Sequence, residues 1–290
     1  MATKTLPALV ILAATSLQSA LVPGAAWSAE SRKKTPAPGS LDDVKEEVRS
    51  ELPARRSVKK TTPAPQAAHK VLLDAWYTIK ANGKTPYAYY NDRVEERGGK
   101  LFFQNHVWKK EEDYINEEQL GAYAQPDGNL TPLFFNFHSV YRTTETSIDG
   151  TVTDGKSFAA RIRKGEQELP VVKRSVPAGT IFAVFFPVWL KMNALNLKPG
   201  QNLAFRTILE DDLANSFALA PGRIQAEKPD PKAKASGTRL FSVDYRDARS
   251  LWWLDDQGVV ARVEMPAQRV LVERVAGEAE ARRFLESEGK

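Results

Sequence analysis

Turn-forming residue pairs recur at short intervals from about residue 72 onward, and the runs between them are rich in β-branched and aromatic side chains. The pairs in the first half of this region are Asn82-Gly83, Gly98-Gly99, Asp127-Gly128, Asp149-Gly150 and Asp154-Gly155. An Asn-Gly or Asp-Gly pair between such runs favours a tight turn between neighbouring antiparallel strands. The spacing therefore predicts an antiparallel meander of long strands, and we assign residues 71–276 to this β domain.

One segment, residues 181–192, departs from the pattern because it is almost continuously apolar. Pro187 suits the first turn of a helix, where its missing N–H would have no partner in any case. The segment therefore predicts a short buried helix over about residues 186–194. The expected fold is mainly β, a long curved antiparallel meander, half-barrel-like, that wraps this short apolar helix. A charged helix or tail is expected at residues 277–290.

The first 29 residues have the composition of a secretory signal peptide. Lys4 precedes an apolar run at residues 6–22, and small residues follow up to Ala29. The run contains several Ser, Thr and Gln residues, which makes it a poor membrane-spanning helix. We therefore expect an exported protein, periplasmic or secreted in a bacterium, with an uncleaved membrane anchor as the alternative.

Residues 30–70 are rich in Pro, Ala, Lys and Arg, which is typical of an extended, disordered linker. Ser40 can cap a short helix over residues 40–52, whose apolar residues fall near helical spacing. This stretch holds ten Lys and Arg against six Asp and Glu, whereas residues 71–290 hold 30 of each sign. A neutral β domain argues against nucleic-acid binding, and the basic linker suits transient contact with an anionic membrane surface or ordinary solvation.

No signature of catalysis stands out. The chain has no cysteine, which fits a bacterial envelope protein and excludes thiol chemistry. The three histidines do not have the spacing of a metal site, and no cofactor-binding motif is present. The adjacent acids Asp211-Asp212 and Asp255-Asp256 could serve acid–base chemistry, but such pairs in turns are usually solvated turn formers.

Residues 251–266 form a Trp-x-Asp-x-x-Gly hairpin followed by a strand, and a Leu-x-Pro-Gly turn lies at residues 197–200. This order resembles the DUF3108-like exported bacterial β-domains over roughly residues 72–275. The resemblance implies a curved antiparallel sheet around a helix, broadly like the periplasmic LolA-type lipoprotein carriers. That group supplies no catalytic residue to transfer to this chain.

Aromatic and aliphatic residues exceed what one thin sheet face can hide, and several strands are apolar on both faces. The excess indicates either an ordinary core between sheet and helix or a concave groove for a lipid, an acyl chain or a hydrophobic peptide. The residues expected to bind such a ligand are Phe182, Phe185, Phe186, Trp189, Trp108 and Trp252.

The resulting hypothesis is a non-catalytic cell-envelope protein that binds an apolar ligand. Two alternatives remain from the sequence, a structural or assembly protein that docks another envelope component and a carboxylate-based hydrolase. The first would present an exposed apolar strip, and the second would place two acids about 5–10 Å apart in a cleft.

Overall fold

The computed structural model describes residues 69–111 and 114–286. The chain divides into two compact units, and all of the described residues belong to one of them. The expected signal peptide, the linker up to residue 68 and the helix at residues 40–52 lie outside the described residues.

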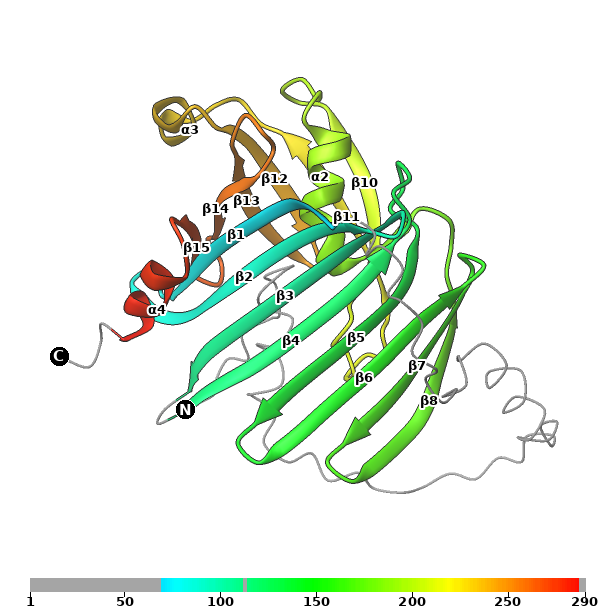
Figure 1. Cartoon of the computed structure of the whole chain (residues 1–290). Helices are drawn as coiled ribbons and strands as arrows, with labels where there is room; N and C mark the ends of the chain where they lie inside the picture. The colour runs from blue at the N-terminus through cyan, green and yellow to red at the C-terminus, as the bar shows by residue number, and fades with distance from the viewer. Residues whose placement is uncertain (1–68, 112–113, 287–290) are drawn as a thin grey trace. The chain divides into compact units, whose positions relative to one another are not determined.

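Fifteen strands within the described residues pair into one continuous sheet (Figure 1). Their bounds are β1 (Lys70–Ala81), β2 (Thr85–Arg97), β3 (Lys100–Glu111), β4 (Tyr114–Ala124), β5 (Pro132–Tyr141), β6 (Thr144–Thr153), β7 (Ser157–Lys164), β8 (Gln167–Ser175), β9 (Thr180–Phe182), β10 (Asn202–Ile208), β11 (Leu219–Ala226), β12 (Arg239–Tyr245), β13 (Ala248–Leu254), β14 (Val260–Met265) and β15 (Val270–Val275). Most neighbours in the sheet are also neighbours in sequence, so the predicted mainly β meander is confirmed.

Two pairings depart from a simple meander. The last strand, β15, returns to pair with the first, so that Trp76 lies opposite Val275 in the middle of the sheet. The sheet edges are therefore β8 and β9, which are consecutive in sequence but lie at opposite ends of the strand order. The short strand β9 pairs with β10 in the parallel direction, because a helical connection separates the two.

That connection is the expected apolar helix. A 3₁₀ turn, η2 (Ala183–Phe185), leads directly into α2 (Phe186–Ala194), with Pro187 in the first turn of α2. The ring of Phe185 packs edge-on against Phe103 at 5.6 Å between centroids, and Phe182 packs against Phe135 at 5.2 Å. These contacts join the β9–α2 segment to the broad curved run of β1 to β8, drawn in cyan and green in Figure 1.

The expected turn at Asp149-Gly150 is wrong, because β6 runs straight through both residues. Gly150 lies opposite Phe135 of β5, and a Cβ atom on Gly150 would fall 2.0 Å from Cε1 of that ring. The glycine therefore makes room for a buried phenylalanine. Gly222 of β11 does the same for Phe205, whose ring lies 2.2 Å from the position of a Cβ.

Two further helices lie at the surface. Before β12, α3 (Pro231–Ser236) forms with Asp230 as its N-cap and Gly237 as its C-cap. At the C-terminus, α4 (Glu278–Glu286) buries Ala281 and Leu285. These two side chains pack on the face of the sheet opposite the core, against an aromatic group that consists of Trp76, Tyr89 and Trp108.

Candidate functional site

An apolar pocket of about 290 Å³ opens between the N-terminal end of β1, the strand β2 and one side of α2. Its lining residues are Leu72, Leu73, Tyr77, Asp92, Val94, Leu101, Pro187, Val188, Lys191, Met192, Gly258, Val259 and Val260. Most of these are hydrocarbon side chains from segments far apart in the sequence. The packing of α2 and of residues 258–260 against β1, β2 and β3 therefore creates the pocket.

The pocket has an exposed end and a buried end. At the rim, Leu72 is 44% exposed and Met192 is 45% exposed. Further along β1 and β2, Tyr77 is 2% exposed and Asp92 is 3% exposed, whereas the buried Val94 lies opposite Leu73, next to the rim. The gradient gives the pocket a direction, from an apolar mouth in water to a closed inner end.

The helix α2 contributes to two environments. Phe186 and Leu190 are fully buried in the core, whereas Val188, Lys191 and Met192 lie on the side that faces the pocket. The turn before β14 approaches this side closely, because a Cβ on Gly258 would lie 2.8 Å from Cγ of Lys191. Gly258 also has a φ of +76°, which favours glycine for the backbone as well.

Asp92 is the acidic residue among the lining residues. Its side chain projects from the inner face of β2, directly opposite Asn105 of β3, and Oδ1 accepts a hydrogen bond of 2.7 Å from Nδ2 of Asn105. Burial raises the pKa of Asp92 to about 8, and the bond from Asn105 only partly opposes this. Asp92 is therefore mainly protonated and neutral at pH 7.

Tyr77 forms the neighbouring wall. Its hydroxyl donates to the carbonyl oxygen of Val260 at 3.2 Å, and its ring stacks on Tyr90 at 4.8 Å between centroids. Burial, with a smaller effect from Asp92, raises the pKa of Tyr77 far above its ordinary value. The phenol is therefore a neutral donor that already has an acceptor.

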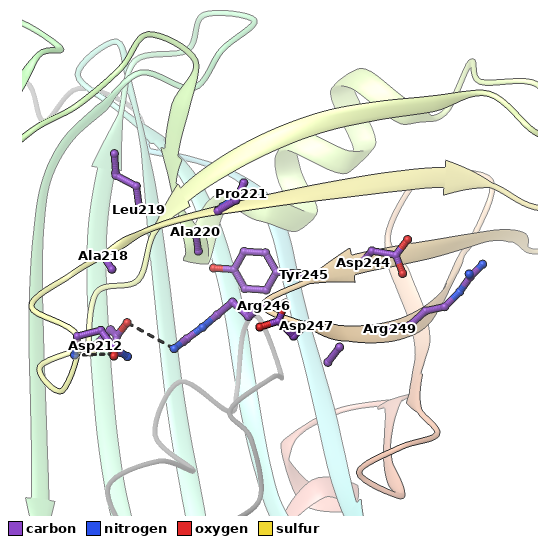
Figure 2. A pocket seen from close by; sticks show the side chains of 12 residues that line it. Asp212, Ala218, Leu219, Ala220, Pro221, Asp244, Tyr245, Arg246, Asp247 and Arg249 are labelled. Atoms are coloured by element: carbon purple, nitrogen blue, oxygen red, sulfur yellow. Dashed lines mark hydrogen bonds and ion pairs between the residues drawn. The ribbon is translucent and has the colours of Figure 1, made fainter.

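A second, larger pocket of about 740 Å³ is polar and open (Figure 2). Its lining residues are Asp212, Asn215, Ala218, Leu219, Ala220, Pro221, Asp244, Tyr245, Arg246, Asp247, Ala248 and Arg249. Figure 2 shows the side chain of Arg246 reaching toward Asp212, and the two lie 3.6 Å apart. Asp212 also accepts a bond of 2.8 Å from the Asn215 side chain.

The polar groups of this second pocket are mostly paired within the protein. The Tyr245 hydroxyl is 2.5 Å from the Thr207 hydroxyl, and Arg249 forms an ion pair of 2.9 Å with Glu227. Arg246 and Asp247 both have positive φ values, 49° and 61°, as a tight hairpin turn requires. The pocket is therefore an open cleft beside a turn, with its buried acid neutralised by Arg246.

Glu210 and Asp211, in the connection between β10 and β11, have different surroundings. Glu210 accepts a hydrogen bond of 3.0 Å from the backbone N–H of Val184 in η2, and burial raises the pKa of Glu210 to about 8. Asp211 is partly buried as a residue, but its Oδ2 is enclosed and has no hydrogen-bond partner. Burial and the nearby carboxylate of Glu118 raise the pKa of Asp211 to about 7.

The two candidate acid pairs do not behave as catalytic pairs. Asp211 and Asp212 are adjacent in sequence, yet Asp212 pairs with Arg246 and Asp211 lies near Glu118. Asp255 accepts backbone bonds from Gln257 at 3.0 Å and from Val259 at 2.8 Å. Asp255 is therefore a turn former, as its position before Gly258 predicts.

None of the six expected ligand-binding aromatics lines either of the two pockets described above. Five of them belong to the main core: Phe182, Phe185, Phe186, Trp189 and Trp252. Trp108 lies on the opposite face of the sheet, where its ring stacks on Tyr89 at 4.8 Å between centroids. Their role in binding stays a prediction, whereas their packing in the structure is that of core and surface aromatic clusters.

The residues that line the apolar pocket were not predicted from the sequence. One signal was available on β2, where Ala88, Tyr90, Asp92 and Val94 alternate and are all buried. An acid within an otherwise apolar inward series is unusual, because burying a carboxyl group is costly. The sequence did not indicate which strands and which helix side would meet this acid.

The two histidines within strands lie beside carboxylates. Nε2 of His106 is 2.5 Å from Glu117, and Nε2 of His138 is 3.1 Å from Glu145. Across residues 69–111 and 114–286, no three His, Cys, Asp or Glu side chains gather closely enough to hold a metal ion. No helix in the same part of the chain is long and apolar enough to cross a membrane.

No protein-family model matches the chain, and no curated protein matches it either. A solved β-barrel-like protein of the domain of unknown function DUF1849, from Brucella abortus, is similar at 14% identity with a TM-score of 0.45. That likeness covers 71% of this chain and 94% of the Brucella chain. A DUF1089 family protein from Pseudomonas aeruginosa is similar at 14% identity with a TM-score of 0.36, over 64% of this chain and 92% of its own.

Both solved structures come from bacteria, and the Brucella protein is described as β-barrel-like. The resemblance to DUF3108-like domains and LolA-type carriers stays a prediction.

Proposed function

We propose that this protein is a non-catalytic binding protein of the bacterial cell envelope, and that the apolar pocket beside α2 holds the hydrocarbon part of a lipid or acyl chain. The pocket carries the proposal, because it leads from the exposed side chains of Leu72 and Met192 to buried apolar walls. Exposure of large apolar side chains to water is unfavourable, and a hydrocarbon chain that covers them removes this cost.

The size of the pocket limits the ligand. Its volume of about 290 Å³ lies at the lower end of ligand pockets. Each methylene group that moves from water into an apolar site contributes about 0.8 kcal/mol. A dissociation constant of about 1 μM corresponds to about 8 kcal/mol, so a chain of about ten carbons is the class that we expect.

The envelope location rests on the N-terminal sequence. Residues 1–29 have the pattern of a secretory signal peptide, and a chain without cysteine folds in an oxidising compartment without any mispairing of thiols. The resemblance to DUF3108-like exported proteins implies the same compartment. A basic linker that contacts an anionic membrane surface would bring the pocket near its ligand.

Native mass spectrometry of the full chain, purified from a bacterial periplasm, tests the proposal when it is combined with organic extraction of bound material. We expect a stoichiometric apolar adduct. Met192→Glu should remove the adduct, because a charge at the rim opposes entry of hydrocarbon. Val171→Glu is the matched control, since Val171 of β8 is 52% exposed and lies outside the lining residues.

Two results would overturn the proposal. One is a clean mass without adduct together with no binding of added decanoate or decanol. The other is equal loss of the adduct in Met192→Glu and Val171→Glu, which would assign binding to another part of the chain.

A further inference from the structure

We propose that the ligand carries an uncharged oxygen at its buried end, and that Asp92 recognises this oxygen by a hydrogen bond. This inference rests on the proposed function and specifies its ligand class as an alcohol, ketone or ester with a medium-length hydrocarbon chain. Asp92 is then a specificity-determining residue of the pocket.

The first observation is the unused oxygen of Asp92. Its Oδ1 accepts from Asn105, and among the described residues Asp92 has no other hydrogen-bond partner. Asp92 is nevertheless only 3% exposed, and it lines the pocket. Oδ2 of Asp92 is not among the enclosed oxygens that lack a partner in the described residues. It is therefore accessible from the pocket, where an oxygen of the ligand can bond to it.

The second observation is the chemistry of the surrounding wall. Val94 and Leu101 beside Asp92 offer no polar side-chain atom, and the Tyr77 hydroxyl already donates to Val260. Lys191 also lines the pocket, but its side chain is exposed near Met192 at the rim. Asp92 is therefore the group at the inner end with hydrogen-bonding capacity to spare.

The third observation is the charge state of this inner end. Burial raises the pKa of Asp92 to about 8, so the group at pH 7 is mainly a neutral acid with one hydroxyl to donate. Asn105 donates to Oδ1, which leaves Oδ2 to carry the proton toward the pocket. A carbonyl or hydroxyl oxygen accepts this proton well, whereas an anionic head group would have to leave water for an apolar site.

The direction of the pocket agrees with this arrangement. An oxygen held at Asp92 leaves the hydrocarbon to extend along Val188 toward Leu72 and Met192. The exposed apolar rim is then covered by the tail of the ligand. A single molecule with one polar end and a hydrocarbon tail can therefore contact Asp92, the apolar walls and the rim at the same time.

The experiment is a competition assay on the full chain, in which decanol and decyl chloride displace the fluorescent probe N-phenyl-naphthylamine. The two competitors have similar size, but only decanol offers a good hydrogen-bonding oxygen. We expect decanol to compete at least about tenfold more tightly, because a site built to hydrogen-bond an oxygen discriminates against an analogue that lacks it.

Two variants of Asp92 assign the preference to this residue. Asp92→Leu should abolish the preference for decanol while decyl chloride still competes, and Asp92→Asn should retain most of it because an amide can also donate. Asp149→Leu is the matched control: Asp149 of β6 also accepts a bond of 2.7 Å from an asparagine directly across the sheet, Asn136, but both residues are exposed.

The outcomes separate the two proposals. Equal competition by decanol and decyl chloride in the wild type, or an unchanged preference in Asp92→Leu, overturns the role of Asp92 and leaves apolar binding intact. Failure of both compounds to displace the probe overturns the proposed function itself. Loss of the preference in Asp92→Leu but not in Asp149→Leu supports the inference.

Discussion

The same pair of side chains occurs on both sides of this sheet. Asp92 and Asn105 face each other across β2 and β3 on the inner side, and Asp149 and Asn136 face each other across β5 and β6 on the outer side. Both pairs have a hydrogen bond of 2.7 Å. The outer pair is surrounded by water, whereas the inner pair lies at the end of an apolar pocket. The comparison shows that environment, and not residue type, makes one of these acids a candidate for ligand recognition.

Ion pairs show the same contrast. On the inner side, Lys109 of β3 is fully buried and its Nζ lies 2.7 Å from Oε1 of Glu118 in β4. On the outer side, Arg163 lies 3.4 Å from Glu145, and both side chains are at least half exposed. A buried charge depends on its partner far more than an exposed charge does, because water cannot replace that partner.

The largest effect should come from breaking the inner ion pair. Lys109→Met leaves Glu118 buried without its cation, and we expect a loss of about 3–5 kcal/mol in the free energy of unfolding. Arg163→Met should change it by less than about 0.5 kcal/mol. Urea denaturation followed by tryptophan fluorescence measures both. Equal losses in the two variants would contradict the contrast between the two sides.

The next effect concerns Gly150 within β6 and Gly128 in the turn between β4 and β5. Gly150→Ala should destabilise the protein by about 1–3 kcal/mol, because the new Cβ would fall 2.0 Å from Cε1 of Phe135 and the core must shift. Gly128→Ala, with no atom within 4 Å of its Cβ position, should be nearly neutral. Thermal denaturation of both variants checks this expectation, and the double variant Gly150→Ala, Phe135→Leu should recover part of the loss. No recovery would place the strain elsewhere.

The free energy of unfolding should also depend on pH, and its change per pH unit should be smaller than the effects of the substitutions above. The pKa of Asp92 is raised from 3.8 to about 8 in the folded protein, so between these values only the folded state holds the proton. The free energy of unfolding should therefore fall as pH rises from about 4 to about 8, with at most about 1.4 kcal/mol per pH unit from this group. Glu210 and Asp211 add slopes of the same sign, since burial also raises their pKa values.

Substitution assigns part of this slope to Asp92. Asp92→Asn should flatten the profile between pH 5 and about pH 8, and Asp149→Asn, which alters the exposed pair, is the matched control. Urea titrations at several pH values provide the measurement. A profile that rises across this window would show that Asp92 is ionised when buried, with a partner other than Asn105.

Much of the fold could be predicted from local sequence. Asn82-Gly83 and Gly98-Gly99 mark real turns between β1, β2 and β3, and Pro187 marks the first turn of α2. The helix α3 could also have been predicted, because Asp230 before Pro231 and Gly237 at the end are ordinary helix boundaries. Local signals work in these cases because the backbone preference belongs to the residues themselves.

Other features depend on partners across the sheet. Asp149-Gly150 has the sequence of a turn, but Gly150 is needed beneath Phe135, and only the register of β5 with β6 shows this. The candidate site is similar. Alternation along β2 could show that Asp92 points inward. Its bond to Asn105 depends on the register of β2 with β3, and its place in one pocket with Val188 depends on how α2 packs on the sheet.

A mainly β meander, an apolar helix at residues 186–194 and the absence of thiol chemistry followed from the amino-acid sequence alone, because hydrophobic periodicity, turn residues and composition act locally. The order of the strands in the sheet, the return of β15 to β1 and the loss of water contact by particular carboxyl groups emerged only in the folded domain. Burial is a property of the whole fold, because it depends on residues from many elements. A carboxyl group such as Asp92 acquires its raised pKa and its unpaired oxygen from residues that the chain brings to it from other strands and from α2.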